Sequence, residues 1–323
     1  MTRVGAAVLL LCGLAAVVGA QAPAGAPEVL KLRPNFYLIA GAGGNVAVQV
    51  GEDGVVVVDS GSAATAGAIL AAIKTITPDP IRYIINTGPD ADHVGGNETI
   101  ARAGETLFGT RSTGLPATFV GQAASILAAE KVLTRMSAPT GQAAPFPFGS
   151  WPTETFDNGR RYMFLNGEGI EVLQQPAAHS DGDAVVFFRR SDVLVTGDVF
   201  DADRFPVIDV ARGGSVQGEI DALNRLIGIA IPSIPIISRE AGTLVIPGHG
   251  HVGDQFDLVH YRDMVTIVRD HVADLIKGGR TLDQIKAAQP AKGYSPRYGA
   301  DSGPWTTNDF IEAIYRSLMA RKS

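Results

Sequence analysis

Cysteine is nearly absent from this sequence: Cys12 is the only one among 323 residues. It lies in an apolar run, residues 4–18, that follows Arg3 and leads to small residues ending at Ala20. This arrangement is typical of a secretory signal peptide, here residues 1–20. The chain that remains after cleavage has no cysteine. Disulfides and thiolate ligands are therefore excluded from it, and any metal site must use His, Asp and Glu.

Basic residues are also few: 27 Lys and Arg stand against 33 Asp and Glu, which gives a net charge of -6. A nucleic-acid-binding surface is therefore not expected. Long apolar runs are lacking as well, since the run at 4–18 is shorter than the roughly 20 residues that span a membrane. An uncleaved membrane anchor is the alternative to the signal peptide, and the short run argues against it. We expect a secreted or periplasmic protein without a stable membrane anchor.

Apolar segments and turn signals alternate along the rest of the chain. Hydrophobic residues make up 46% and charged residues 19% of the sequence, which indicates an ordinary globular core. Residues 21–28, rich in Ala and Pro, are predicted to be a flexible lead-in. Strand-like and helix-like segments then continue to the end without a linker, so we predict a single domain over 29–323 with C-terminal helices. The expected fold class is α/β, with two β-sheets packed together and helices outside.

Local patterns predict further elements: helices over 94–103 and 122–136, and a short strand over 106–108. The Pro- and aromatic-rich segment 144–156 is predicted to be a loop. Its aromatic side chains either form a wall beside a substrate or pack back on the core: Phe146, Phe148 and Trp151.

Polar side chains that bind metals or transfer protons recur at the ends of five successive apolar strands. They are Asp59; Asp90, Asp92 and His93; His179; Asp198; and His249. Strand ends are where α/β sheets tend to place their chemistry. Imidazoles and carboxylates that converge from separate loops are what a hydrolytic metal site requires. The sequence therefore predicts a metal site built from these strand ends.

The motifs around these residues resemble, in their order, those of the metallo-β-lactamase superfamily. The matching segments are Asp92-His93 before Val94-Gly95-Gly96-Asn97, His179 in AHSDGD, Asp198 in VTGD and His249 in PGHG. The resemblance runs from the first strands to the His249 loop and implies a four-layer αβ/βα sandwich. It also implies that Asp59, in VVVVDSG, supports the loop of Asp92 and His93 without itself binding the metal.

Two neighbouring metal sites are implied by the resemblance. The second-site group is Asp92, His93 and His249, with Asp198 often bridging. The first-site group has His at two positions where this chain has Gly88 and Asp90, so that Asp90, His179 and Asp198 remain. Gly88 has no side chain to bind a metal, and Asp90 offers oxygen instead of nitrogen. We therefore expect one or two ions, zinc by default, with manganese or iron as alternatives.

The hypothesis that follows is an exported metal-dependent hydrolase with a small-molecule substrate. A metal-bound hydroxide would attack an ester, thioester, lactone or amide carbonyl, or a phosphate or sulfate ester. Asp92 or Asp90 would orient the water and shuttle its proton. The alternatives are a β-lactamase outside the subclass with a Cys ligand, a degenerate binding member favoured by Gly88, and a redox member with iron.

Other polar features have more than one interpretation. His251 either replaces a lost ligand or is exposed on its loop, and His260 and His271 are expected to be solvated. The Gly-rich segment 41–45 leads into a strand, which argues against a phosphate-binding loop. Segments 204–209 and 213–215 have two interpretations. They either shape the pocket, or they only pack as loops and cap the following helix, with Ser215 as the cap residue.

Overall fold

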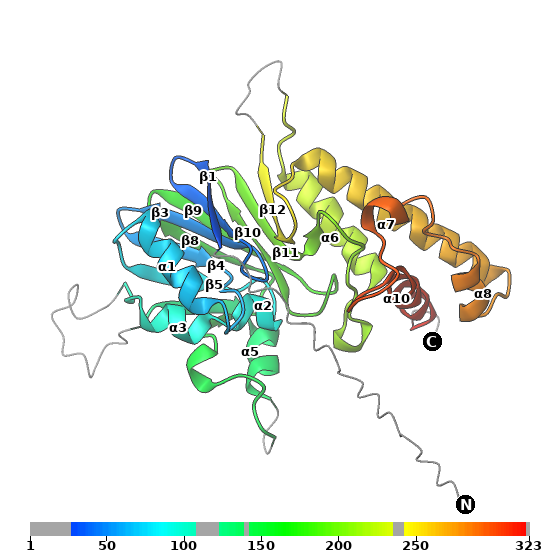
Figure 1. The fold of residues 1–323 in the computed structure, drawn as a ribbon, viewed down its shortest axis with the longest axis horizontal. Coiled ribbons are helices and arrows are strands. Elements are labelled where there is room, and N and C mark those ends of the chain that lie inside the picture. The colour runs from blue at the N-terminus through cyan, green and yellow to red at the C-terminus, as the bar shows by residue number, and fades with distance from the viewer. Residues whose placement is uncertain (1–26, 108–122, 139–141, 235–241, 321–323) are drawn as a thin grey trace, which may run out of the picture.

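The computed structural model describes residues 27–107, 123–138, 142–234 and 242–320 (Figure 1). Seven strands form the first sheet in the order of the chain, antiparallel from β1 to β4 and parallel from β4 to β7. They are β1 (Glu28–Arg33), β2 (Phe36–Ala40), β3 (Val46–Gly51), β4 (Gly54–Val58), β5 (Ile81–Ile85), β6 (Ser125–Ala129) and β7 (Glu154–Phe156).

Five strands form the second sheet, in the order β12-β11-β10-β9-β8. The pair β11 and β12 is parallel, and the other neighbours are antiparallel. Their bounds are β8 (Arg160–Leu165), β9 (Glu168–Gln175), β10 (Asp183–Phe188), β11 (Val193–Asp201) and β12 (Leu244–His249).

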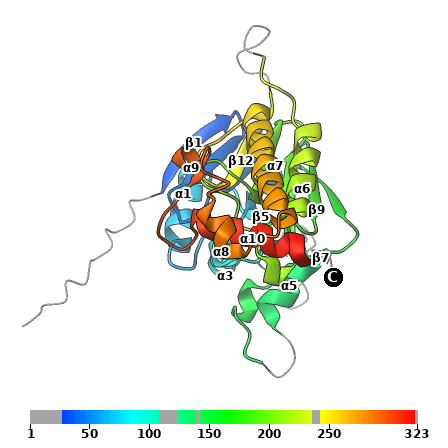
Figure 2. The same ribbon diagram turned by 90° about the vertical axis from the view of Figure 1, so that its right-hand side faces the viewer.

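Helices cover the outer face of each sheet (Figures 1 and 2). The helices α1 (Ala66–Ile76) and α3 (Asn97–Arg102) pack on the first sheet. The helices α6 (Val216–Ile229), α7 (Gln255–Lys277) and α10 (Thr307–Ala320) pack on the second. Shorter helices are α2 (Ala91–Val94), α5 (Glu130–Ser137), α8 (Leu282–Ala287), α9 (Ser295–Tyr298), and the 3₁₀ turns η1 (Phe148–Ser150) and η2 (Val210–Arg212).

Alternating side chains of the central strands divide the core into three layers. On β4, Val56 and Val58 face the second sheet, whereas Val55 and Val57 face α1 and α3. On β10, Val186 faces the first sheet and Val185 faces α6 and α7. Because the inner strands are buried on both faces, their sequences are continuous apolar runs. The expected αβ/βα sandwich is confirmed.

The predicted helix over 122–136 is wrong in its first half, where the chain forms strand β6 before helix α5 begins at Glu130. The apolar run of β6 is inserted in parallel between β5 and β7. A short apolar run buried on both faces has no period that separates strand from helix.

Two other predicted elements differ from the structure. The predicted helix over 94–103 is interrupted, because Gly95 and Gly96 lie between α2 and α3. A side chain at Gly96 would collide with the carbonyl of Ser60, so the chain needs glycine where it leaves the site loop. In the predicted strand 106–108, the described residues Thr106 and Leu107 are irregular, and Phe108 lies outside the described residues. The signal peptide also lies outside them.

The aromatic side chains of segment 144–156 divide between the two interpretations. Phe146 and Trp151 are partly buried and pack against the core between the sheets. Phe148 is 81% exposed and contacts the edge of Trp151. Core packing is therefore confirmed for two of the three. Among the helices of the described residues, none is long and apolar enough to cross a membrane.

Candidate metal centre

His93 is held from behind by Asp59, at the end of β4. The Nδ1 atom of His93 lies 2.8 Å from Oδ2 of Asp59. Thr87 donates to the same carboxylate twice, from its backbone N–H at 2.8 Å and from its hydroxyl at 2.6 Å. Both Asp59 and His93 are buried. A carboxylate acceptor at Nδ1 fixes a proton there and directs Nε2 toward the centre, where the deprotonated nitrogen can bind a metal.

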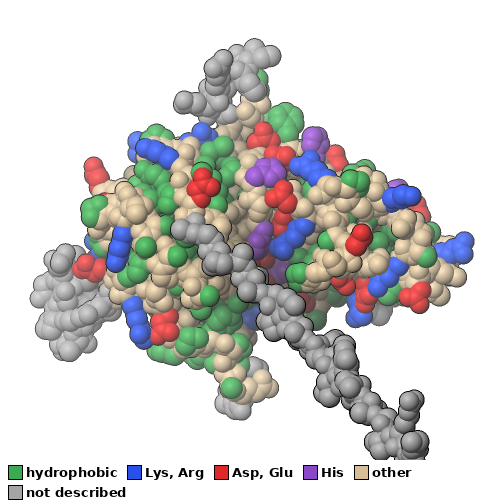
Figure 3. Space-filling view, viewed as in Figure 1, with side chains coloured by type: hydrophobic (Ala, Val, Ile, Leu, Met, Phe, Trp, Pro, Cys, Tyr) green, Lys and Arg blue, Asp and Glu red, His purple; other side chains and the backbone are tan. Residues whose placement is uncertain are grey.

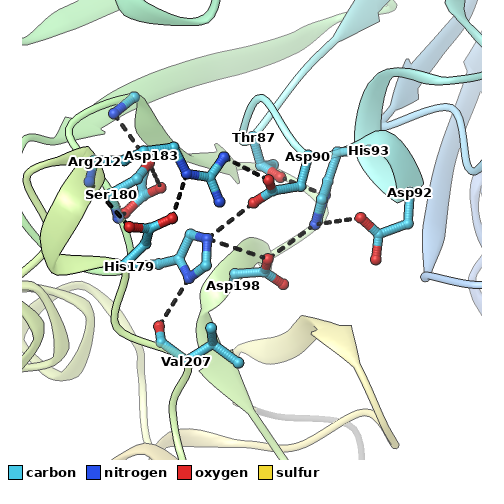
Figure 4. A network of polar contacts seen from close by, with 12 residues as sticks. Thr87, Asp90, Asp92, His93, His179, Ser180, Asp183, Asp198, Val207 and Arg212 are labelled. Carbon is cyan, nitrogen blue, oxygen red and sulfur yellow. Dashed lines mark hydrogen bonds and ion pairs between the residues drawn. The ribbon is translucent and has the colours of Figure 1, made fainter. Parts of the chain in front are cut away.

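The second-site group brings Asp92, His93 and His249 together, with their ligand atoms within 4.8 Å of one another. Nε2 of His249 lies 2.9 Å from Oδ2 of Asp92. Nε2 of His93 is buried without a hydrogen-bond partner among the described residues, and Oδ2 of Asp198 lies 3.2 Å from it. Figure 4 shows Asp198 between the imidazoles of His93 and His179. These side chains, predicted at separate strand ends, thus lie close together, although Asp198 lies within β11 and not at its end.

The loop that carries His249 depends on close backbone contacts. Asn45 donates from its backbone N–H to the carbonyl of Gly248 at 2.9 Å. Its side-chain amide donates to the carbonyls of Pro247 and Gly250, at 2.9 and 3.0 Å. A Cβ at Gly248 would lie 2.5 Å from Oδ1 of Asp198, so glycine lets the two strand ends approach. Asn45, in segment 41–45, therefore supports the loop that carries His249, a role that its sequence did not suggest.

The first-site group, Asp90, His179 and Asp198, also has its ligand atoms within 4.8 Å of one another. Here Oδ2 of Asp90 lies 2.9 Å from Nε2 of His179, and Nδ1 of His179 donates to the carbonyl of Val207 at 2.8 Å. Arg212 donates from Nη1 to Oδ1 of Asp90 at 2.6 Å. Burial alone would raise the pKa of Asp90, but the hydrogen bonds from His179 and Arg212 lower it to about 2.

Arg212 was not predicted from the sequence: it lies in the turn η2, between segments 204–209 and 213–215, and its contact with Asp90 leaves no local pattern. Asp209 caps this turn and binds Nε of Arg212 at 2.5 Å. Ser215 caps α6, as expected, by accepting from the N–H of Gly218. Segment 213–215 thus caps the helix, and segment 204–209 contacts the site through the carbonyl of Val207; Arg212 lies outside both segments.

Carboxylates surround the imidazoles and determine their pKa values. Burial lowers the pKa of His179, but the hydrogen bond to Asp90 and nearby negative charges raise it to about 10. Burial likewise opposes the charged form of His93. The negative charges of Asp198 and Asp59, and their hydrogen bonds, nevertheless raise the pKa of His93 well above its usual value. Burial raises the pKa of Asp198, and the adjacent imidazoles hold it far below its ordinary range. The centre therefore has a strongly negative potential, which favours a cation.

These observations agree with the donor set that a divalent metal needs. His93 presents a buried, unpartnered nitrogen toward two carboxylates, and its other nitrogen is committed to Asp59. Ligating His side chains are usually oriented by such an acceptor behind them. Asp92 and His249 are partly exposed, so the centre is open to solvent. Figure 3 shows His side chains beside acidic and basic ones on this face of the molecule. The second-site group therefore fits a divalent ion.

The remaining His side chains lie outside both groups. His251 is exposed and pairs with Asp203 at 3.1 Å instead of joining the donors. His260 and His271, on α7, are exposed, as predicted. At Gly88, a Cβ would meet no heavy atom within 4 Å, so the position that lacks the imidazole is surrounded by open space.

A cavity of about 860 Å³ lies elsewhere. Its lining includes the turns between β3 and β4 and between β8 and β9, at Asp53 and Asn166. These turns are at the opposite ends of the strands from the His and Asp cluster. We place the candidate site at the cluster, because the cavity has no convergent donors of comparable kind.

Residues 39–249 match the family described as the metallo-beta-lactamase superfamily. This segment includes all the strands from β3 to β12 and every residue of both groups. The chain belongs to the metallo-beta-lactamase superfamily. No curated protein matches the chain.

Solved structures share the fold at low sequence identity. A metallo-beta-lactamase from Pontibacter korlensis superposes with a TM-score of 0.53 at 19% identity, over 74% of this chain and 99% of that one. The metallo-beta-lactamase DIM-1 gives 0.53 at 16% identity, over 74% of this chain and 97% of that one. The inverting sec-alkylsulfatase Pisa1 from Pseudomonas sp. gives 0.60 at 16% identity, over 90% of this chain. This chain spans 50% of that sulfatase.

Proposed function

We propose that this protein is an exported metal-dependent hydrolase that acts on a small ester, thioester, lactone or amide. The observation that carries the proposal is the geometry of His93, which is fixed by Asp59 and presents an unpartnered Nε2 toward Asp92 and Asp198. Membership of the metallo-beta-lactamase superfamily supports the hydrolytic class. Export rests on the signal-peptide pattern at residues 1–20.

Asp92, His93 and His249 would hold the ion, with Asp198 beside them. Zinc suits this mixed set of imidazoles and carboxylates, and manganese or iron are alternatives. When bound, a divalent metal lowers the pKa of water and polarises a substrate oxygen. Burial raises the pKa of Asp92, but the hydrogen bond from His249 lowers it below the usual value. Asp92 is therefore ionised at neutral pH and can accept a proton from water.

Asp90 is the other proposed acid–base residue. Both of its oxygens are engaged, one by His179 and one by Arg212. It therefore orients neighbouring groups more readily than it exchanges protons. The open space at Gly88 lies along the same loop and leaves room for a substrate beside the donors.

Two narrower functions fall within this proposal. A β-lactamase activity is a candidate because two of the similar structures are metallo-beta-lactamases. Hydrolysis of a sulfate ester is another, because the sec-alkylsulfatase superposes over more of this chain than those lactamases do. Identities of 15–19% show only the fold, so neither is preferred over carboxylic ester or lactone hydrolysis.

The alternative from a different class is a binding protein on the same scaffold. Gly88 favours it, because a ligand position of the family has no side chain. Such a protein would bind metal and a small molecule without turnover.

Turnover of a substrate panel separates these functions. We expect zinc-loaded protein to hydrolyse at least one of a p-nitrophenyl ester, a thioester, a lactone, nitrocefin and a secondary alkyl sulfate. A variant with His93→Ala and His249→Ala should lose at least about 100-fold in rate. The matched control removes two exposed imidazoles, His260→Ala with His271→Ala, and should keep its rate. Absence of turnover in every assay, or equal rates in the two variants, would reject the hydrolase.

A further inference from the structure

The first-site group contains a permanent cation. Arg212 donates to Oδ1 of Asp90 at 2.6 Å, while His179 lies 2.9 Å from Oδ2 of the same carboxylate. A guanidinium keeps its charge at any pH at which the protein folds. Both oxygens of Asp90 are thus already engaged by positively charged or donating groups (Figure 4).

Arg212 is also fixed in place by its own loop. Its Nε donates to Asp209 at 2.5 Å, and its backbone carbonyl accepts from Arg135 at 2.8 Å. Its side chain is 32% exposed, so more than half of it is shielded from solvent. The guanidinium is therefore a built part of the site.

The second-site group has no such cation. Among the described residues, the ion pairs of Asp92 and Asp198 involve only His side chains. Nε2 of His93 is buried and has no hydrogen-bond partner among the described residues, whereas both ring nitrogens of His179 have one. The two groups therefore differ in kind: one is open to an added cation and the other already contains one.

We propose that the guanidinium of Arg212 takes the place of a metal ion at the first-site group. The chain then binds one divalent ion, at the second-site group. The first-site group remains a network of ion pairs that holds Asp90 and His179 in position. Gly88 agrees with this arrangement, because an imidazole there would have no ion to bind. This inference rests on the proposed function in that it requires metal binding at the second-site group.

Metal stoichiometry tests the role of Arg212 without any enzyme assay. The full-length mature protein is saturated with Zn²⁺, passed through a desalting column and analysed for zinc per chain. A parallel Co²⁺ titration follows the visible absorption of each site. The wild type is expected to bind one ion. Arg212→Gln removes the charge and should bind two, whereas Arg212→Lys keeps the charge and should bind one.

A second variant keeps the test decisive if Arg212→Gln binds its extra ion weakly. Combining Gly88→His with Arg212→Gln supplies the missing imidazole in open space. It should hold the second ion at least about tenfold more tightly than Arg212→Gln alone. Circular dichroism establishes that each variant is folded.

The outcomes separate this inference from the proposed function. Two ions in the wild type would overturn the role of Arg212 and leave a metal-dependent hydrolase intact. One ion in the wild type and in both Gln-containing variants would also overturn it, because the charge would not be what limits binding. No ion in the wild type would overturn both.

Discussion

Asp59 offers the sharpest perturbation of the proposed metal centre, because it never needs to touch the ion. Its carboxylate accepts from Nδ1 of His93 at 2.8 Å and from the hydroxyl of Thr87 at 2.6 Å, both on Oδ2. Its Oδ1 accepts from the backbone of Thr87 at 2.8 Å. Asp59→Asn keeps the volume, and it can keep the backbone contact by placing the amide oxygen there. The amide NH₂ then faces two donors.

The magnitude follows from these contacts. Removing the acceptor behind a ligating His typically costs about 10–100-fold in metal affinity, or about 1.4–2.8 kcal/mol. Loss of a charge-assisted hydrogen bond in the buried site should also lower the free energy of unfolding by about 1.5–3 kcal/mol. We therefore expect weaker zinc binding together with a measurable fall in stability.

Competition with a chromophoric chelator measures the zinc affinity, and urea denaturation measures the stability. Asp53→Asn is the matched control, since Asp53 is an exposed carboxylate that accepts from the backbone of Asn166 at the far end of the strands. It should leave the zinc affinity unchanged. If Asp59→Asn bound zinc within about twofold of the wild type, the orientation of His93 by Asp59 would be refuted.

Two further predictions concern neighbours of the centre. Gly248→Ala places a Cβ 2.5 Å from Oδ1 of Asp198 and should weaken zinc binding at least about tenfold, measured by the same competition; unchanged affinity would show that the contact is not needed. Glu219 is buried, and burial raises its pKa well above the usual 4.5. Its folded form therefore holds a proton that the unfolded form has released, so stability falls as the pH rises above that value. The stability of Glu219→Gln relative to the wild type should therefore increase as the pH rises above about 4.5 in urea denaturation, and a difference independent of pH would contradict this.

Much of the site could be predicted because its donors lie at strand ends. The apolar strands fix where each loop starts, and the ends of parallel strands meet at one edge. The parallel pair β4 with β5 in the first sheet, and the parallel pair β11 with β12 in the second, each bring two of the predicted positions side by side, although Asp198 lies within β11. The helices α6 and α7 could be predicted as well, since one apolar face repeats along each of them.

The sequence pattern failed where tertiary contacts decide. The sequence of β6 has no polar–apolar alternation, because both faces of the strand are buried. The sequence pattern therefore predicts these residues as part of a helix. Arg212 and Asn45 act through contacts with residues far away in the chain: Arg212 with Asp90, and Asn45 with the loop of His249. Such contacts leave no local pattern. The sequence alone therefore predicted a weakened first-site group, and the cation that lies in it became visible only in the structure.

The most direct test of the central claim is elemental analysis of the protein purified without a His-tag. The claim is that the second-site group holds a divalent ion. We predict about one zinc, manganese or iron ion per chain in the wild type and almost none in the variant with His93→Ala and His249→Ala. An equal metal content in the two proteins, whether both are empty or both are loaded, would contradict the account.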